Sequence, residues 1–186
     1  MKSPFYFIAK PHKGTRYANT EDWDGTEIIV NTSEEDAKFS NRKAIVVQTP
    51  LGYDGPIKSG YTLLVHHNVF KYYNDMYGRR KSGKSFFKED TFFIEPDQFF
   101  MYHDGNEWKA HDRYCFVSPV TAEDCYIQKP THEPLMGRME YPNEYLKSKG
   151  VKKGTLVTFT PDSEYEFDVE GEMMYRIFDH QITMKL

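Results

Sequence analysis

A pattern of turn and strand that occurs twice is the feature that most limits how this chain can fold. Residues 55–67 read GPIKSGYTLLVHH, and residues 149–161 read KGVKKGTLVTFTP. Each segment has an apolar residue, a Lys, one more residue and a Gly, followed by a short strand-like stretch. The shared positions pair Ile57 with Val151, Lys58 with Lys152, and Gly60 with Gly154.

The repeat continues on both sides of this pattern, in the same order. Upstream, residues 4–11 (PFYFIAKP) match residues 113–120 (RYCFVSPV), and downstream, residues 90–101 match residues 173–184. The downstream match aligns two pairs, Ile94 with Ile177 and Gln98 with Gln181. Because self-similarity in a fixed order indicates one supersecondary unit used twice, we expect a tandem duplication.

The duplication predicts two domains. The first copy covers residues 1–104, the second covers residues 112–186, and residues 105–111 link them. A chain of 186 residues is long enough for two small domains. The first copy is the more divergent, because it carries an insertion near residues 69–88 at the place where the second has a hairpin.

Composition and pattern favour an all-β fold. The chain has 14 Tyr, 14 Phe, 10 Pro and 12 Gly, a mixture typical of short strands joined by turns. No segment has a sustained helical period, and the best helix candidate is NEYLKSKG at 143–150. Many short strands with frequent turn signals indicate a small barrel or sandwich.

Charge and hydropathy narrow the function classes. The net charge is −4, so no overall positive field favours nucleic acid or an anionic membrane. No run of about 18 apolar residues predicts a membrane span, and the first residues lack the pattern of a signal peptide. Two cysteines, Cys115 and Cys125, form neither a disulfide framework nor a zinc site. We therefore expect a soluble protein of a reducing cytoplasm.

The second copy carries several further distinctive features. It opens with Asp112 and Arg113, has Gly137 before a short strand, and continues through GVKKGTLVTF to a hairpin, SEYEFDVEGEMMYRI. In these features residues 112–186 resemble a GroES-like co-chaperonin, and residues 1–104 resemble a second, divergent copy. The resemblance implies two tandem GroES-like irregular β-barrels, the first with an insertion.

The resemblance also implies a partner. Domains of this family form rings that cap a GroEL-type chaperonin, and each reaches it through a mobile loop with an apolar tripeptide. The matching stretch, residues 13–41, is polar, acidic and rich in turn residues, as disorder requires. Ile28, Ile29 and Val30 lie in its middle, and the resemblance assigns docking to them. On the residues alone, TEIIV also fits an ordinary edge strand packed on its own barrel.

The second copy has only residues 121–137 at the equivalent place. This stretch is shorter, contains two prolines and lacks an apolar triplet, so Tyr126 and Ile127 are its only candidates for a secondary contact. We expect the second copy to act as a scaffold of the ring rather than to dock on the chaperonin. In the first copy, LGYDG at 51–55 replaces the roof hairpin of bacterial co-chaperonins. That shortening is similar to co-chaperonins of tailed bacteriophages, which implies a phage protein in a host cytoplasm.

Residues 78–85 read GRRKSGKS and match the phosphate-binding loop of nucleotide hydrolases. Such a loop requires a buried strand before it and a helix that begins at its Lys-Ser, with backbone N–H groups that hold phosphate. The preceding NVFKYYNDMY is polar and aromatic, and the following FFKEDTFFIEP is typical of strands. The sequence therefore disfavours nucleotide binding through Gly83, Lys84 and Ser85. Alternatives are a solvated basic insertion, single-stranded nucleic acid on interleaved aromatics, and contact with cargo or an anionic chaperonin surface.

No other cluster indicates catalysis or metal binding. His66 and His67 are adjacent residues at the end of a strand. Because adjacent strand residues point to opposite faces, we do not expect both to bind one metal. The acidic residues between 164 and 170 alternate with apolar ones, which predicts a strand with one wet face. The favoured function is therefore a non-enzymatic co-chaperonin with no cofactor of its own, whose ATP is bound by the partner chaperonin. The alternative is a virion or assembly protein that uses the barrel as a structural module.

Overall fold

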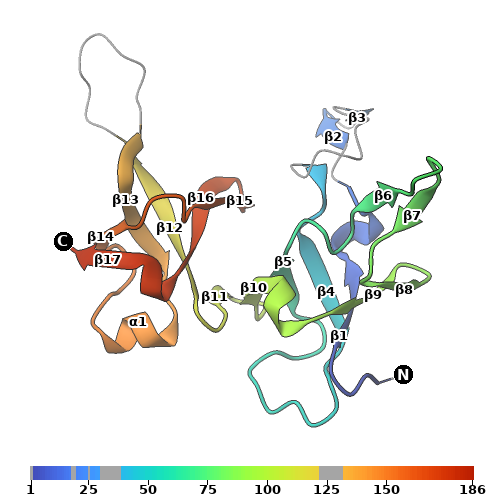
Figure 1. Ribbon diagram of the computed structural model, residues 1–186, viewed down its shortest axis with the longest axis horizontal. Coiled ribbons are helices and arrows are strands. Elements are labelled where there is room, and N and C mark those ends of the chain that lie inside the picture. The colour runs from blue at the N-terminus through green and yellow to red at the C-terminus, as the bar shows by residue number, and fades with distance from the viewer. Residues whose placement is uncertain (1, 18–19, 25, 30–38, 122–131) are drawn as a thin grey trace. The chain divides into compact units, whose positions relative to one another are not determined.

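The computed structural model describes residues 2–17, 20–24, 26–29, 39–121 and 132–186. Antiparallel strands dominate these residues, and the helices are short, so the expected all-β class is confirmed (Figure 1). The chain divides into two compact units, Met1–Glu107 and Trp108–Leu186. This division falls inside the predicted linker, residues 105–111. No helix of the described residues is long and apolar enough to cross a membrane.

The first unit contains one main antiparallel sheet. Within the unit its strand order is β10-β5-β4-β1-β9-β8. The strands are β1 (Phe7–Pro11), β4 (Lys43–Gln48), β5 (Thr62–Val65), β8 (Phe86–Lys88), β9 (Thr91–Ile94) and β10 (Phe99–His103). Neighbours in this order are far apart in the sequence at several places, so the sheet holds distant segments of the first 107 residues in one unit.

Two further hairpins of the first unit form small sheets of their own. The first follows the 3-10 helix η1 (His12–Gly14) and consists of β2 (Thr20–Trp23) and β3 (Thr26–Ile29). The second consists of β6 (Tyr72–Asn74) and β7 (Arg80–Ser82), and in Figure 1 it stands out from the main sheet near β8 and β9. The β2–β3 hairpin lies in the connection between β1 and β4, and the β6–β7 hairpin lies in the connection between β5 and β8.

The second unit repeats the main sheet of the first. After β11 (Trp108–Ala110), its order is β17-β14-β13-β12-β16-β15. The elements are β12 (Tyr114–Thr121), β13 (His132–Tyr141), α1 (Glu144–Ser148), β14 (Leu156–Phe159), β15 (Tyr165–Val169), β16 (Glu172–Phe178) and β17 (Ile182–Lys185). When the six main-sheet strands of each unit are taken in chain order, corresponding strands occupy the same positions in the two sheets. The two units therefore have the same topology.

Hydrogen bonds in the repeated turn agree atom for atom. The N–H of Gly60 donates to the carbonyl of Val46 at 2.8 Å, and the N–H of Gly154 donates to the carbonyl of Met139 at 2.7 Å. Both glycines have positive φ, 90° and 85°, a conformation that is strained for residues with a Cβ atom. The Gly at the end of the repeated motif is therefore required by the turn, as the sequence pattern indicated.

A second repeated turn contains the aligned glutamines. Each ends a 3-10 helix, which is η3 (Pro96–Gln98) in the first unit and η4 (Asp179–Gln181) in the second. The Oε1 atom of Gln98 accepts from the N–H of Glu95, and that of Gln181 accepts from the N–H of Phe178, both at 3.0 Å. These shared side-chain contacts support duplication more strongly than strand order alone does.

The structure corrects the alignment of the first repeated strand by one residue. Ile94 lies opposite Phe7, whereas Ile177 lies opposite Cys115. Phe7 therefore corresponds to Cys115, and not to Phe116 as the match of residues 4–11 with 113–120 predicts. Apolar residues run through both strands, so the sequences align in either register, but the cross-strand partner fixes only one.

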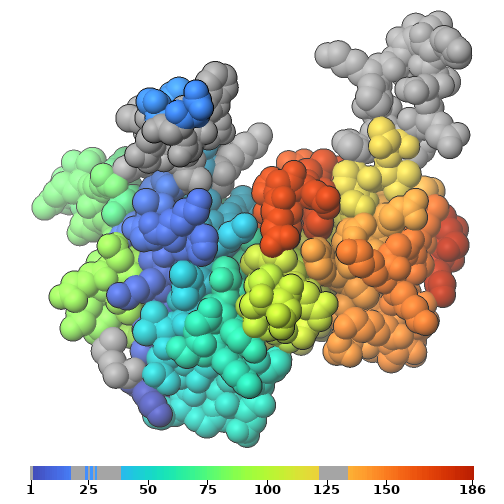
Figure 2. All heavy atoms as spheres, turned by 180° about the vertical axis from the view of Figure 1, so that it is seen from behind, coloured from blue at the N-terminus to red at the C-terminus, as the bar shows by residue number. Residues whose placement is uncertain are grey.

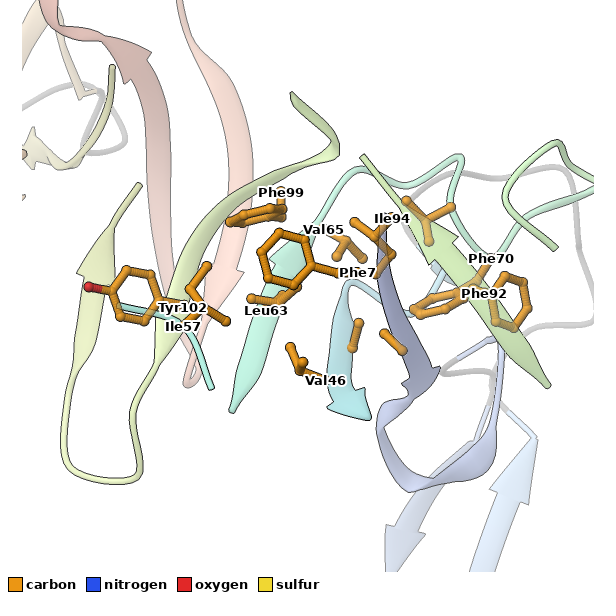
Figure 3. Close-up of a cluster of buried hydrophobic side chains, with 13 residues drawn as sticks. Phe7, Val46, Ile57, Leu63, Val65, Phe70, Phe92, Ile94, Phe99 and Tyr102 are labelled. Carbon is orange, nitrogen blue, oxygen red and sulfur yellow. The ribbon is translucent and has the colours of Figure 1, made fainter. Parts of the chain in front are cut away.

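Each unit has its own apolar core. In the first unit, Figure 3 shows aromatic rings from several strands meeting in the interior. The rings of Phe7 and Phe99 lie edge to face with a centroid distance of 5.4 Å. The second core includes Cys115, Val117, Met139, Leu146, Val151, Val157, Phe159 and Ile177. Helix α1 adds Leu146 to this core, and the side chain of Asn143 caps its first turn by accepting from the N–H of Leu146. The predicted helix at 143–150 is therefore present, in a shorter form.

The insertion of the first unit is narrower than predicted. Strand β8, residues 86–88, pairs with β9 just as β15 pairs with β16, so it belongs to the repeated hairpin. Val69 and Phe70 are fully buried in the first core. Of the predicted insertion at 69–88, the β6–β7 hairpin is therefore the part without a counterpart in the second unit.

Candidate functional site

The predicted docking loop, residues 13–41, contains the β2–β3 hairpin. Ile28 and Ile29 lie on β3, where they pair with residues of β2, and the side chain of Ile28 is 43% exposed. Val30 lies outside the described residues. Within the residues that the structure describes, β3 has its ladder with β2 and not with the main sheet. The alternative of an ordinary edge strand on the barrel therefore does not describe the arrangement of β3.

Hydrogen bonds hold the two ends of this loop together. Tyr17 forms a β-bridge with Ser40, and the N–H of Asn41 donates to the carbonyl of Arg16 at 2.9 Å. The side-chain amide of Asn41 also donates to the carbonyl of Thr15 at 2.7 Å. The loop therefore leaves and re-enters the first unit through a hydrogen-bonded stem.

Arg16 attaches this stem to the β6–β7 hairpin. Its guanidinium lies 4.4 Å from the ring centre of Tyr72 and 4.6 Å from that of Phe86. One of its terminal nitrogens donates to the hydroxyl of Ser82 at 2.8 Å. The side chain is only 9% exposed, so these contacts replace much of the hydration of the cation.

Tyr17 adds a second link between the stem and the hairpin. Its ring stacks on Tyr72 with a centroid distance of 6.0 Å, and its hydroxyl accepts from the N–H of Tyr72 at 2.8 Å. Arg80 lies over Tyr72 at 3.7 Å. Sequence reasoning missed this junction, because Arg16 and Tyr17 are an ordinary pair at the start of a polar loop. Their partners are more than 50 residues away in the sequence.

The structure places GRRKSGKS in a hairpin and a turn, not in a phosphate-binding loop. Gly78 has φ of 72° in the β6–β7 turn, and residues 80–82 form β7. The ammonium of Lys84 lies 3.2 Å from Glu95, and Ser85 is buried with its hydroxyl near Gln98. Strand β8 follows Ser85 directly, so this segment has no helix N-terminus at which phosphate oxygens would bind.

The β6–β7 hairpin presents cations and apolar side chains to solvent. Met76 and Tyr77 at its tip are 89% and 73% exposed. Arg79 and Lys81 lie within 3.6 and 3.8 Å of Asp75, which organises the turn by accepting from the backbone N–H of Tyr77 and Arg79. In Figure 2, the green spheres of this segment form a lobe at the edge of the first unit.

The two adjacent histidines lie only partly as predicted. His66 and His67 follow the end of β5, as expected of strand-end residues, but they do not face opposite ways, since their rings are tilted by 32° with centroids 4.1 Å apart. Burial, then the nearby His66 and the cations Arg42 and Lys71, lower the pKa of His67 to about 4. Among the described residues, no group of three or more His, Cys, Asp or Glu side chains is placed to hold a metal ion.

In the second unit, the equivalent of the docking loop lies between β12 and β13, and its candidates Tyr126 and Ile127 are outside the described residues. The predicted wet face of β15 is confirmed. Glu166 and Asp168 are exposed, whereas Phe167 between them is buried. The β15 residues thus alternate between solvent and core as the sequence pattern indicated.

A buried carboxylate lies at the start of η4. Asp179 accepts from Arg113 at 2.9 Å and from the side-chain amide of Asn143 at 3.1 Å. Burial alone would raise the pKa of Asp179, but the hydrogen bonds from Arg113 and Asn143 outweigh it and lower the pKa below its ordinary value of 3.8. This network joins η4 to the cap of α1 at Asn143 and to Arg113, the residue before β12, which is a structural role.

Cys115 is a core residue, as predicted. It lies in β12, is fully buried, and its thiol donates to the carbonyl of Ile177 at 3.4 Å. Burial, together with the charge of Asp179, raises the pKa of the thiol to about 12, which disfavours the reactive thiolate. Cys125 lies outside the described residues.

In comparisons with known proteins, no protein-family model matches this chain and no curated protein matches it. The internal duplication and the junction at Arg16 are properties of the chain itself.

Proposed function

We propose that the chain is a co-chaperonin made of two tandem GroES-like barrels, which caps a GroEL-type chaperonin and assists ATP-dependent protein folding. The carrying observation is the exposed Ile28 on a hairpin outside the main sheet, at the place where the resemblance puts a docking loop. A stem fixed by Tyr17, Ser40 and Asn41 presents this hairpin from the barrel. This arrangement suits a segment that binds a groove on a partner.

The energetics suit a reversible cap. Each apolar side chain of the 28–30 triplet would contribute about 1.5–3 kcal/mol when it is buried in a groove. Ordering of the loop and loss of translational freedom oppose this gain, so one loop binds weakly. Several loops on one homo-oligomeric ring raise the effective concentration, and the ring as a whole then binds firmly. Weak single contacts also let the cap dissociate when the chaperonin changes conformation.

In this proposal the chain has no catalytic residues and no cofactor. The partner chaperonin binds and hydrolyses ATP, and the chain contributes a rigid scaffold and a docking segment. The site of action is the cytoplasm, that of the host if the protein is phage-encoded. Rigid duplicated barrels fit this role, because the ring contacts and the docking contacts are then carried by different elements.

Replacement of the docking residues tests the proposal. We expect Ile28→Asp and Ile29→Asp each to abolish co-sedimentation with a GroEL-type chaperonin in the presence of ATP, and to abolish assisted refolding. Val47→Asp is the matched control, because Val47 lies on β4 and is 42% exposed, close to the exposure of Ile28. Normal binding and refolding by both docking variants would sink the assignment.

A further inference from the structure

An open cleft in the second unit has no part in the proposed function. Its volume is about 410 Å³, within the range of about 300–1,000 Å³ for small-molecule sites. It is lined by residues from the start of β12, from α1 and the turn after it, from η4 and from β17 (Figure 1). All of these elements belong to the second unit, so one unit supplies the whole cleft.

The lining of this cleft is positive, although the unit around it is acidic. Residues 112–186 contain 9 Lys or Arg and 13 Asp or Glu residues, a net charge of −4. The cleft is lined by three of these cations, Arg113, Lys149 and Lys185, and by one carboxylate, Asp179. With His180 counted as neutral, the lining therefore has a net charge of +2.

Two of the three cations are available to a ligand. Lys149 and Lys185 are exposed, and neither forms an ion pair with a carboxylate of the described residues. The ammonium of Lys149 lies 5.4 Å from the ring centre of Tyr145, and that of Lys185 donates to the carbonyl of Gly150 at 2.8 Å. Because an ammonium has three donors, Lys185 retains two after this bond.

The carboxylate in the lining is already satisfied by the protein. Both Nε and a terminal nitrogen of Arg113 donate to one oxygen of Asp179, and the amide of Asn143 donates to the other oxygen. The side chain of Asp179 is only 4% exposed, whereas that of Arg113 is 57% exposed. The charge that the cleft presents to solvent is therefore positive.

The cleft also has an apolar wall. Tyr145 and Met184 line it and are 56% and 57% exposed, and the buried core residues Leu146 and Val151 line it as well. Helix α1 supplies two of these side chains, and the described part of the first unit contains no α-helix. An apolar lining with a few polar groups that fix orientation is typical of sites for small organic ligands.

We propose that this cleft binds a small phosphate monoester that has an apolar or aromatic body. Such a phosphate has a charge of about −1.5 to −2 at pH 7, which matches the positive lining better than the single charge of a carboxylate does. Its oxygens accept charge-assisted hydrogen bonds from the ammonium and guanidinium groups, and its body packs on Tyr145 and Met184. This inference goes beyond the proposed function and does not depend on it.

The competing interpretation is that the two lysines only stabilise the end of α1. Lys149 follows the last residue of the helix, Lys185 donates to the carbonyl of Gly150, and cations are favourable near a helix C-terminus. In that case replacement of the lysines lowers the stability of the second unit and has no effect on a ligand. Binding and thermal stability are therefore measured separately.

Isothermal titration of the full chain with phenyl phosphate, in a phosphate-free buffer, tests the proposal. We expect saturable binding with a dissociation constant of about 1 mM or less. Lys149→Met with Lys185→Met should weaken this binding about tenfold or more. Lys147→Met with Lys152→Met is the matched control, because it removes two exposed lysines of the same unit that do not line the cleft, and it leaves binding unchanged.

Further ligands and variants separate the contributions of charge and of the apolar wall. Benzoate and inorganic phosphate should bind more weakly than phenyl phosphate, and benzyl alcohol, which has no charge, should not bind. Tyr145→Ala should weaken the binding of phenyl phosphate more than that of inorganic phosphate. Lys149→Arg with Lys185→Arg keeps both charges and should retain binding.

Several outcomes would overturn the inference. One is the absence of saturable phenyl phosphate binding up to about 10 mM. Others are equal binding by the two Lys→Met double variants, and a cleft variant that loses thermal stability but binds as the wild type does. A cleft variant whose mass in sedimentation velocity changes, while its binding does not, would identify a contact between copies instead. The titration needs no chaperonin, so its failure is distinct from failure of the docking assignment at Ile28.

Discussion

The guanidinium of Arg16 lies 4.4 Å from the ring centre of Tyr72, and this contact joins the stem of the proposed docking loop to the β6–β7 hairpin. Both segments interrupt the main sheet of the first unit, at different places in the sequence. Their common anchor means that a change in one affects the other.

We predict that Arg16→Ala destabilises the first unit by about 2 kcal/mol, because a largely desolvated cation over aromatic rings and its hydrogen bond to Ser82 are lost. Urea unfolding measures the stability, and trypsin cleavage at residues 79–84 measures loosening of the hairpin. Arg79→Ala is the control, since Arg79 is 70% exposed and surface ion pairs contribute little. Equal effects of the two variants would contradict the anchoring role.

A close contact in the second unit allows a double-variant test. A Cβ atom on Gly137 would lie 2.8 Å from Cγ2 of Val117, so Gly137→Ala is expected to cost about 1–3 kcal/mol through overpacking. Val117→Ala alone is expected to cost about 2 kcal/mol. The combination should cost less than the sum, since the smaller residue accommodates the new methyl group. Additive losses in urea unfolding would show that the contact is not the cause.

The network around Asp179 predicts a loss of stability in acid. The pKa of Asp179 is lower in the folded protein than its ordinary 3.8, so the unfolded state takes up the proton first. Its stabilising contribution is therefore present above pH 3.8 and is lost as the pH falls below that value. Asp179→Asn should have a flatter stability profile in this range. A parallel decline in both proteins, followed by circular dichroism, would exclude Asp179 as the source.

The thiol of Cys115 is expected to resist labelling in the folded protein, because its pKa is raised to about 12 and its side chain is fully buried. In a Cys125→Ser background, a disulfide reagent should react only as fast as the protein opens, and reaction should become rapid in urea. Complete labelling within the mixing time under native conditions would mean that β12 is open to solvent.

The strand after Ser85 predicts that the chain does not bind nucleotide at GRRKSGKS. Isothermal titration with Mg-ATP should give no binding heat for the wild type or for Lys84→Ala. Gly83→Ala is a second variant of the same segment and should likewise give no binding heat. Its new Cβ atom meets the nearest backbone oxygen at 3.4 Å, an ordinary contact, so we expect the fold to be retained. Binding that disappears in Lys84→Ala would reinstate the phosphate-binding loop.

Much of the fold could be predicted from local chemistry. The turn at Gly60 and Gly154 requires positive φ and a fixed spacing, and the cap at Asn143 depends on residues three positions apart, so both leave a signature in the sequence. The register of β1 leaves no such signature in the sequence, because consecutive apolar residues fit either alignment. Only the pairing with the partner strand decides between the two alignments.

The candidate site was less accessible to sequence reasoning. Ile28 stands out as part of an apolar triplet in an acidic loop, and it lies on an exposed hairpin strand. The junction of Arg16 and Tyr17 with Tyr72 depends on tertiary contacts between distant segments, and no pattern in the sequence marks it. The strand-end position of His66 and His67 was predicted correctly, but their opposite orientation was not, since β5 ends just before His66 and the strand alternation ends with it.

The shared strand order of the two units has a consequence for folding. During folding, each of the six main-sheet strands of one unit has a counterpart in the other unit that could take its place, which is a known hazard for repeated folds. The two halves differ in how they fill one spot: Ala9 and Ala44 occupy it in the first, and Val117 and Gly137 in the second. A hybrid sheet that brought Ala44 beside Val117 would be overfilled. We therefore expect the unequal side chains at matching positions to disfavour pairing between strands of different units.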